Sequence, residues 1–131
     1  MEKTTLSPSS IHQPFSSYSH GISVEGAQRI IFCAGQVAAD PEGTIVGEGD
    51  FDAQVDQVMT NLKAVLAEAN ASLEDVVQIT MYVVGTENAP KARIILRNHF
   101  DHIRPASTLC VLAGLADPRL MVEITAFAAV G

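Results

Sequence analysis

The strongest periodic pattern in this chain lies in residues 51–69, where apolar side chains recur at steps of three and four. This spacing gathers them on one face of an α-helix, while polar side chains occupy the opposite face. The apolar positions are Phe51, Val55, Val58, Met59, Leu62, Val65, Leu66 and Ala69. Asp50 provides an N-cap, and Asn70-Ala71-Ser72 ends the pattern. A helix with a single apolar face must pack against another layer of secondary structure.

Six further segments have the composition of β-strands, namely residues 2–5, 20–25, 29–37, 76–84, 107–113 and 120–129. Residues 6–19 are rich in Ser and Pro and predict an irregular arm. A second amphipathic helix is predicted to open at Asn88 and Pro90, with apolar residues as far as Ile103. The order β-β-β-α-β-α-β-β predicts one α+β domain over residues 1–131, with a mixed six-stranded sheet and two helices on one face.

Strand 76–84 carries apolar residues at both parities, with Ile79 and Met81 alternating with Tyr82 and Val84. A strand of this kind is buried on both faces of its sheet. Two helices suffice for one face only, so a partner subunit is expected to cover the other. The composition agrees, because 47% of the residues are hydrophobic and the mean hydropathy is +0.21.

The charge balance argues against a nucleic-acid partner. The chain has 15 acidic and 8 basic residues, for a net charge of −7, and its basic residues are scattered. No apolar core of a signal peptide and no window of about 20 apolar residues is present, so we expect a cytoplasmic protein without membrane contact. Cys33 and Cys110 lie in apolar runs and are predicted to be buried free thiols.

Common catalytic motifs are missing from the sequence. It contains no Gly-rich phosphate loop, CxxC, HExxH or GxSxG pattern. His99 and His102 have i,i+3 spacing on a predicted helix, but no carboxylate or Cys lies at a fitting offset. We therefore expect neither a metal site nor a cofactor.

Glu123 is the residue that least fits its surroundings. It lies in the apolar run Leu120-Met-Val-Glu-Ile-Thr-Ala-Phe-Ala, which is predicted to be a buried strand. A carboxylate there must be paired, hydrogen-bonded or protonated. One interpretation is a structural acid paired with Arg119 or with another subunit. The functional one is a carboxyl group in an apolar cleft that handles protons or a water molecule.

Two other positions are unusual. Gly35 lies inside an apolar strand, where glycine is unfavourable unless a ligand or another backbone comes close, or the strand has a bulge. Tyr18 follows the irregular arm, where it either packs against the domain or caps a pocket.

These positions belong to a longer pattern that resembles the RidA/YjgF family of enamine/imine deaminases, also called endoribonuclease L-PSP. The pattern covers about residues 10–130 and includes the helix from Gln54 to Ala69. Its other segments are Tyr18-Ser-His-Gly, Ile31-Phe-Cys-Ala-Gly-Gln36, Leu73-Glu-Asp-Val-Val-Gln-Ile-Thr-Met-Tyr-Val, Arg104-Pro-Ala-Ser-Thr-Leu and Leu120-Met-Val-Glu-Ile-Thr-Ala-Phe-Ala.

The resemblance implies a chorismate-mutase-like α+β fold and a homotrimer whose sheets line a central barrel. It also implies three sites, each in a cleft between subunits. Active members hydrolyse a small imine or enamine, typically derived from an amino acid, to a 2-oxo acid and ammonia.

The resemblance also assigns roles to single residues. Glu123 matches the acid that holds or protonates the water, Gly35 matches a backbone contact near the substrate, and Tyr18 matches an aromatic residue that lines the cleft. Deaminase members carry an arginine for the substrate carboxylate where this chain has Ser107. Arg93, at a helix position that is commonly Asn in the family, is a candidate replacement cation.

The leading hypothesis is therefore a Rid-type hydrolase acting on a small imine, enamine or related metabolite without the usual carboxylate anchor. The alternative is a non-catalytic trimer in which Ser107, Thr108 and Glu123 only bind a small ligand. A third hypothesis, a ribonuclease or translation inhibitor, is disfavoured by the acidic composition and the lack of a basic stripe.

Overall fold

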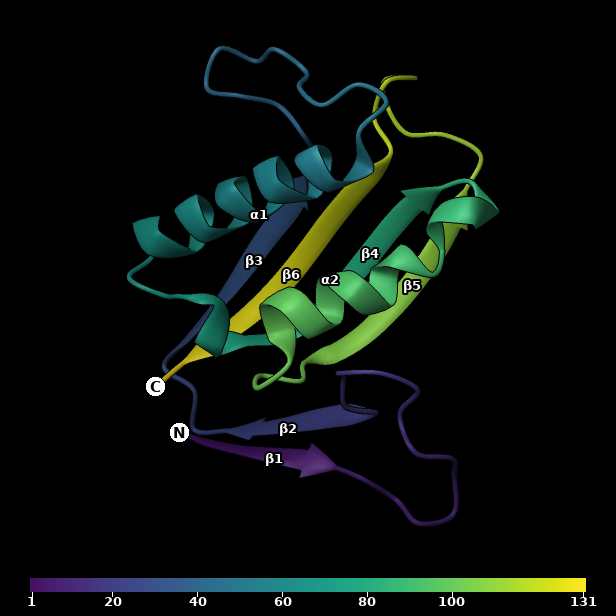
Figure 1. Ribbon diagram of the computed structural model, residues 1–131. Coiled ribbons are helices and arrows are strands. Elements are labelled where there is room, and N and C mark those ends of the chain that lie inside the picture. Colours follow the sequence, from purple (N-terminus) through teal and green to yellow (C-terminus); the bar gives the residue numbers. More distant parts are fainter.

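The computed structural model describes residues 1–131, and its elements follow the predicted order (Figure 1). The strands are β1 (Glu2–Leu6), β2 (Gly21–Glu25), β3 (Arg29–Gln36), β4 (Val76–Val84), β5 (Ala106–Leu112) and β6 (Val122–Val130). The helices are α1 (Phe51–Glu68) and α2 (Lys91–Phe100), with short 3-10 helices η1 (Leu73–Asp75) and η2 (Thr86–Asn88) before β4 and α2. The predicted α+β class is confirmed.

The six strands form two sheets, not the single six-stranded sheet that the sequence predicts. Four of them pair in the order β3-β6-β4-β5, and β1 pairs only with β2. The larger sheet is mixed as predicted, since β4 and β5 are parallel and its other pairs are antiparallel. Ser19, just before β2, donates its backbone N–H to the Pro105 carbonyl at 3.1 Å. This bond holds the chain at the start of β5, and the β1–β2 hairpin lies beyond the end of the larger sheet (Figure 1).

Both helices pack on the same face of the four-stranded sheet (Figure 1). The predicted N-cap of α1 is confirmed, because Asp50 accepts a hydrogen bond from the Ala53 N–H at 3.1 Å. The largest fully buried side chains come from the helices and from the sheet positions that face them, and include Leu62, Leu66, Ile79, Met81, Phe100 and Ile124. The core therefore lies between the helices and this face, which we call the helix-covered face.

Two amides on α1 fasten the segments next to β3 and β6. The Asn61 side chain donates to the carbonyls of Val37 and Ala39 at 3.0 and 2.9 Å, just after β3. The buried Gln54 amide donates to the Arg119 carbonyl at 2.9 Å and accepts from the Met121 N–H at 2.8 Å, just before β6. These bonds satisfy buried polar groups and fix the ends of two adjacent strands.

Helix α2 ends at Phe100, three residues before the predicted limit at Ile103. The N–H groups of Ile103 and Arg104 both bond to the Phe100 carbonyl, at 3.0 and 2.8 Å, which closes the last turn. Pro105 disfavours the right-handed helical conformation at Arg104, which instead has a φ of 51°. Pro105 therefore ends the helix at Phe100, whereas the apolar pattern continues to Ile103.

The opposite side of the four-stranded sheet, which we call the helix-free face, has no layer of the chain over it. Phe32 on β3 is 73% exposed, and its ring meets that of Phe127 on β6 edge-on, with centroids 5.3 Å apart. Ile30 is also exposed on this side. A contiguous apolar surface of this kind is typical of an interaction site.

Candidate functional site

A cavity of about 230 Å³ lies on the helix-covered side, between α2, strands β4 and β5, and the N-terminal arm. We call it the helix-side cavity. Its walls are Phe15, Ser16, Tyr18, Met81, Ala89, Ala92, Arg93, Leu96, Ser107 and Leu109. Three residues proposed from the sequence as substrate contacts, Tyr18, Arg93 and Ser107, therefore line one space.

The arm is held against the domain by its serines. The Ser17 hydroxyl donates to the Asp101 carboxylate at 2.6 Å, and the Ser19 hydroxyl donates to the Arg104 carbonyl at 2.6 Å. Both serines are buried. Tyr18 lies between these two anchors, and its hydroxyl oxygen accepts the Phe15 N–H at 3.1 Å. The irregular arm is thus a fixed wall of the cavity.

Arg93 is the only charged residue that lines the helix-side cavity. Its guanidinium forms no ion pair and no hydrogen bond, whereas Arg119 and Arg104 are close to Asp117 and Asp101. The Ser107 hydroxyl also has no hydrogen-bond partner within the chain. The cavity wall therefore offers one free cation and one free hydroxyl group.

Glu123 lies on the helix-free face, on the other side of the sheet from Ser107. Along β6 it alternates with the buried residues Val122 and Ile124, and it is itself partly exposed. It forms no ion pair and no hydrogen bond. The structural alternative of a pair with Arg119 is wrong within this chain, because Arg119 binds Asp117 at 2.9 Å.

Gly35 lies directly against the Glu123 carboxylate. A Cβ atom built on Gly35 would be 2.7 Å from the carboxyl carbon of Glu123 and closer still to one of its oxygens. The pairing of β3 with β6 also shifts between Cys33 and Gln36, so the strand does contain a bulge at this point. A side chain at this position would therefore displace the Glu123 carboxyl group from where it lies now.

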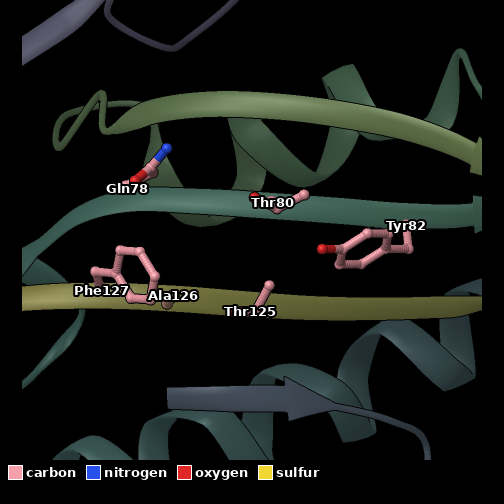
Figure 2. A pocket seen from close by; sticks show the side chains of 6 residues that line it. All are labelled: Gln78, Thr80, Tyr82, Thr125, Ala126 and Phe127. Carbon is pink, nitrogen blue, oxygen red and sulfur yellow. The ribbon is translucent and has the colours of Figure 1, made fainter. Parts of the chain in front are cut away.

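A second cavity, of about 210 Å³, opens on the helix-free face, and we call it the sheet-face cavity. Figure 2 shows its walls on two adjacent strands, Gln78, Thr80 and Tyr82 on β4 and Thr125, Ala126 and Phe127 on β6. The Tyr82 hydroxyl points between Thr80 and Thr125 (Figure 2). Its lining combines polar and apolar side chains and carries no charge.

The strand register separates the proposed site residues into two groups. Ser107 pairs with the buried Ile79 and shares the helix-covered face with Leu109. Thr108 pairs with Thr80 and Cys110 with Tyr82, and Tyr82 also pairs with Glu123, so these residues belong to the helix-free face. Thr108 thus lies apart from Ser107, because adjacent residues of a strand point to opposite faces.

Four groups away from the two cavities have perturbed pKa values. The hydrogen bond to Asp117 raises the pKa of Arg119. Hydrogen bonds from Arg119 lower the pKa of Asp117 to about 2. Burial raises the pKa of the Cys33 thiol. Burial, helped by the positive charge of Lys63, lowers the pKa of His99.

Cys33 is buried and Cys110 half-buried, and both are free thiols. Neither α-helix has the combination of length and hydropathy needed to cross a bilayer.

Sequence reasoning missed the apolar walls of the helix-side cavity. The apolar walls include Phe15 from the irregular arm, Leu96 from α2 and Leu109 from β5. The arm has no periodicity that indicates where it packs. The two serines on either side of Tyr18 were the available signal, because small hydroxyl side chains often fasten irregular segments to backbone and carboxylate groups.

Comparisons with known proteins show which family the chain belongs to. The family model described as Endoribonuclease L-PSP matches residues 9–130. A RutC family protein of Pyrococcus abyssi is 32% identical over 128 residues, covering 98% of both chains. A RutC family protein of Synechocystis is 35% identical over 112 residues, covering 85% of this chain and 84% of that protein.

A solved structure extends the likeness to the whole fold. YyfB of Yersinia pestis, a protein of unknown function in the conserved Rid family, superposes with a TM-score of 0.85 at 33% identity. The alignment covers 99% of this chain and 100% of that one. The chain therefore belongs to the endoribonuclease L-PSP family, the RidA/YjgF family that its motifs resemble.

Proposed function

We propose that this protein is a RidA-like hydrolase that acts on a small imine, enamine or related metabolite. One observation carries the proposal: Glu123 is a partly exposed carboxyl group with no partner in the chain, and it lies against Gly35 in a mostly apolar strand. A carboxyl group without a structural partner in such a position is available for proton transfer.

The chemistry needs few groups. Proton transfer to the imine nitrogen makes the adjacent carbon more electrophilic, and a water molecule then adds its oxygen to that carbon. The C–N bond breaks, leaving a carbonyl compound and ammonia. Glu123 is the candidate that holds the water and moves the protons. A positioned acid–base group of this kind contributes roughly 10²–10⁴-fold to rate.

The proposed site requires more than one copy of the chain. Glu123 and Gly35 lie on one face of the sheet, while Tyr18, Arg93 and Ser107 line a cavity on the other. No single chain can present both groups to one small ligand through the sheet between them. We therefore propose a homotrimer with a central barrel, in which each site combines the two groups from neighbouring copies. The exposed Phe32 and Ile30 support contact at the helix-free face.

The substrate of this protein is expected to be atypical for the family. Ser107 can donate one neutral hydrogen bond, whereas an arginine at that position would bind a carboxylate through two charged ones. A 2-imino acid therefore loses its usual anchor, and the ligand must be held by other residues of the cavity.

Hydrolysis of 2-iminopropionate, generated in the assay by an amino-acid oxidase, tests the proposal. The wild type is compared with Glu123→Gln and Ser107→Arg. Turnover by the wild type that is lost in Glu123→Gln supports a hydrolase that holds its substrate without the usual arginine. Turnover by Ser107→Arg alone supports an intact water-handling site adapted to another ligand.

The rival function is a non-catalytic trimer that binds a small ligand, and the neutral Ser107 favours it. Inactivity of all three proteins, with normal circular dichroism spectra, would contradict the hydrolase and support this rival. Activity that survives in Glu123→Gln would remove the assigned role of the carboxyl group.

A further inference from the structure

The β1–β2 hairpin has little support from the rest of its own chain. All five residues of β1 are exposed, and no residue of β2 is fully buried. A two-stranded hairpin by itself is marginally stable in water, so this one needs a further partner. We propose that the hairpin is exchanged between copies, with β2 of one copy paired to the free edge of β3 in the next. Each copy gives one hairpin and receives one, which closes a ring such as the proposed trimer.

Both strands of the proposed pair have an unused edge. β2 pairs only with β1, and β3 pairs only with β6. The backbone groups of β2 form no hydrogen bond outside the pairing with β1. An edge of this kind presents a row of unpaired N–H and C=O groups, to which another strand can be added. The two edges, five and eight residues long, therefore suit each other.

The chain cannot make this pairing within one copy. Ser19 is bound to the carbonyls of Arg104 and Pro105 at the start of β5. In the order β3-β6-β4-β5, strands β5 and β3 are opposite edges, three strand spacings or about 14 Å apart. β2 crosses this width beyond the end of the sheet (Figure 1). Antiparallel pairing with its own β3 would put Gly21 on the far edge, but the two residues from Ser19 to Gly21 span at most about 7 Å.

The sequence between the strands sets the register of the exchanged pair. Only residues 26–28 separate β2 from β3, which is the spacing of an antiparallel hairpin. Exchange of an element between identical copies keeps the contacts that the closed form would make. Glu25 then lies opposite Arg29 of the next copy. Glu25 forms no ion pair within its own chain, so the exchange places opposite charges side by side at this end of the pair.

Apolar side chains also match in this register. Val24 lies opposite Ile30 of the next copy, and Ile22 lies opposite Phe32. Ile30 is 51% and Phe32 73% exposed in one chain, on the helix-free face. Opposed residues of two paired strands point to the same face of a sheet, so Ile22 and Val24 cover apolar surface that a single chain leaves in water. The interface proposed for the helix-free face thereby continues over the edge of β3.

The exchange has a consequence for the site, and this step alone rests on the proposed function. The register places Gly21 opposite Cys33 of the next copy, two residues before Gly35. Tyr18, three residues before Gly21, lines the helix-side cavity, while Gly35 lies against the Glu123 carboxylate. The hairpin therefore connects the cavity of one copy to the carboxyl group of the next.

Disulfide cross-linking of the full-length protein tests the exchange without requiring activity. The native Cys33 and Cys110 are first replaced by alanine. The first cysteine pair is Val24→Cys with Ile30→Cys, which the register places opposite each other. Mild oxidation is followed by denaturing gel electrophoresis without reductant, and circular dichroism checks that each variant is folded.

A second matched pair and a control complete the design. The second pair is Ser23→Cys with Ile31→Cys, because closer and wider pairs alternate along an antiparallel ladder and one of two neighbouring pairs is the closer one. The control is Val24→Cys with Ala34→Cys, in the same background. Ala34 is exposed on the same strand as Ile30 but lies four residues further along, or about 13 Å out of register.

We expect at least one matched pair to link different copies, so that dimers and trimers of the 13.9 kDa chain appear on the gel. The control should give at least tenfold less of them. Links confined to single chains would overturn the exchange in favour of a closed hairpin. Absence of links in both matched pairs, or equal yields in the control, would also overturn it.

The outcome is separable from that of the proposed function. Links between copies, in a protein that hydrolyses no imine, keep the exchange and remove the enzyme. Imine hydrolysis by a protein whose matched pairs form no links between copies keeps the enzyme and removes the exchange.

Discussion

The two faces of the four-stranded sheet differ in what covers them. On the helix-covered face, α1 and α2 bury Ile79, Met81 and Ile124 completely. On the helix-free face, aromatic rings stay exposed around a cavity lined by hydroxyl groups and an amide (Figure 2). Each face also holds one part of the proposed site. A single chain therefore completes its core, whereas the site proposed above would draw on both faces and so on more than one copy.

Truncation of a core residue on α1 should give the largest effect on the fold. We expect Leu62→Ala to lower the free energy of unfolding by about 2–5 kcal/mol, because the side chain is fully buried and its removal leaves a cavity. Urea denaturation followed by circular dichroism measures the change. A loss below about 1 kcal/mol would contradict the position of the core.

A charge on the helix-free face should act on assembly instead. Phe32→Asp is expected to keep the circular dichroism spectrum of the wild type, because Phe32 is 73% exposed in one chain. Light scattering should show the oligomer replaced by a species of about 13.9 kDa, since an unpaired buried carboxylate disfavours the interface. An unchanged oligomer would show that another surface joins the copies.

A methyl group at Gly35 should disturb the Glu123 carboxylate without unfolding the domain. We expect Gly35→Ala to lower kcat by about tenfold or more, because its Cβ would overlap the carboxyl group and displace it from a productive position. Gly114→Ala is the matched control, because its Cβ would meet no atom within 4 Å. Equal rates for the two variants would remove the role of the Gly35 contact.

The smallest effect is expected from the turn before β6, which belongs to neither face. Arg119 lowers the pKa of Asp117 to about 2 from 3.8. The ionised carboxylate therefore adds stability that is present above pH 3.8 and lost as the pH falls through about 2. We expect the wild type to exceed Asp117→Asn in unfolding midpoint at pH 6, and the difference to shrink towards pH 2. A constant difference would contradict this linkage.

Local patterns were sufficient to predict every strand, both helices and the unusual position of Glu123. They could not predict how strands pair, so the separate β1–β2 hairpin was missed. Alternation along β5 does indicate that Ser107 and Thr108 face opposite ways. Whether Ser107 or Thr108 shares the face of Glu123, however, depends on the register between β5, β4 and β6. The register between strands is set by contacts between residues that lie far apart in the sequence, so local patterns do not determine it.

The resemblance to the family supplied roles for Glu123, Gly35 and Tyr18, and the structure adds their surroundings. The contact of Gly35 with Glu123 follows from a strand bulge, which the glycine itself indicated. The cavity around Arg93 depends on the packing of an arm without periodicity. Its position is set by the bonds of Ser17 and Ser19 with residues about 85 positions later.

The central claim is that Glu123 of one copy acts with the Arg93 and Ser107 cavity of another. Complementation tests it most directly: Glu123→Gln and Arg93→Gln proteins are unfolded, mixed in equal amounts and refolded together, and imine hydrolysis is measured. Sites between copies predict that the mixture recovers about a quarter of the wild-type activity, since random mixing gives that share of intact sites. A mixture no more active than the two variants refolded separately would contradict the claim.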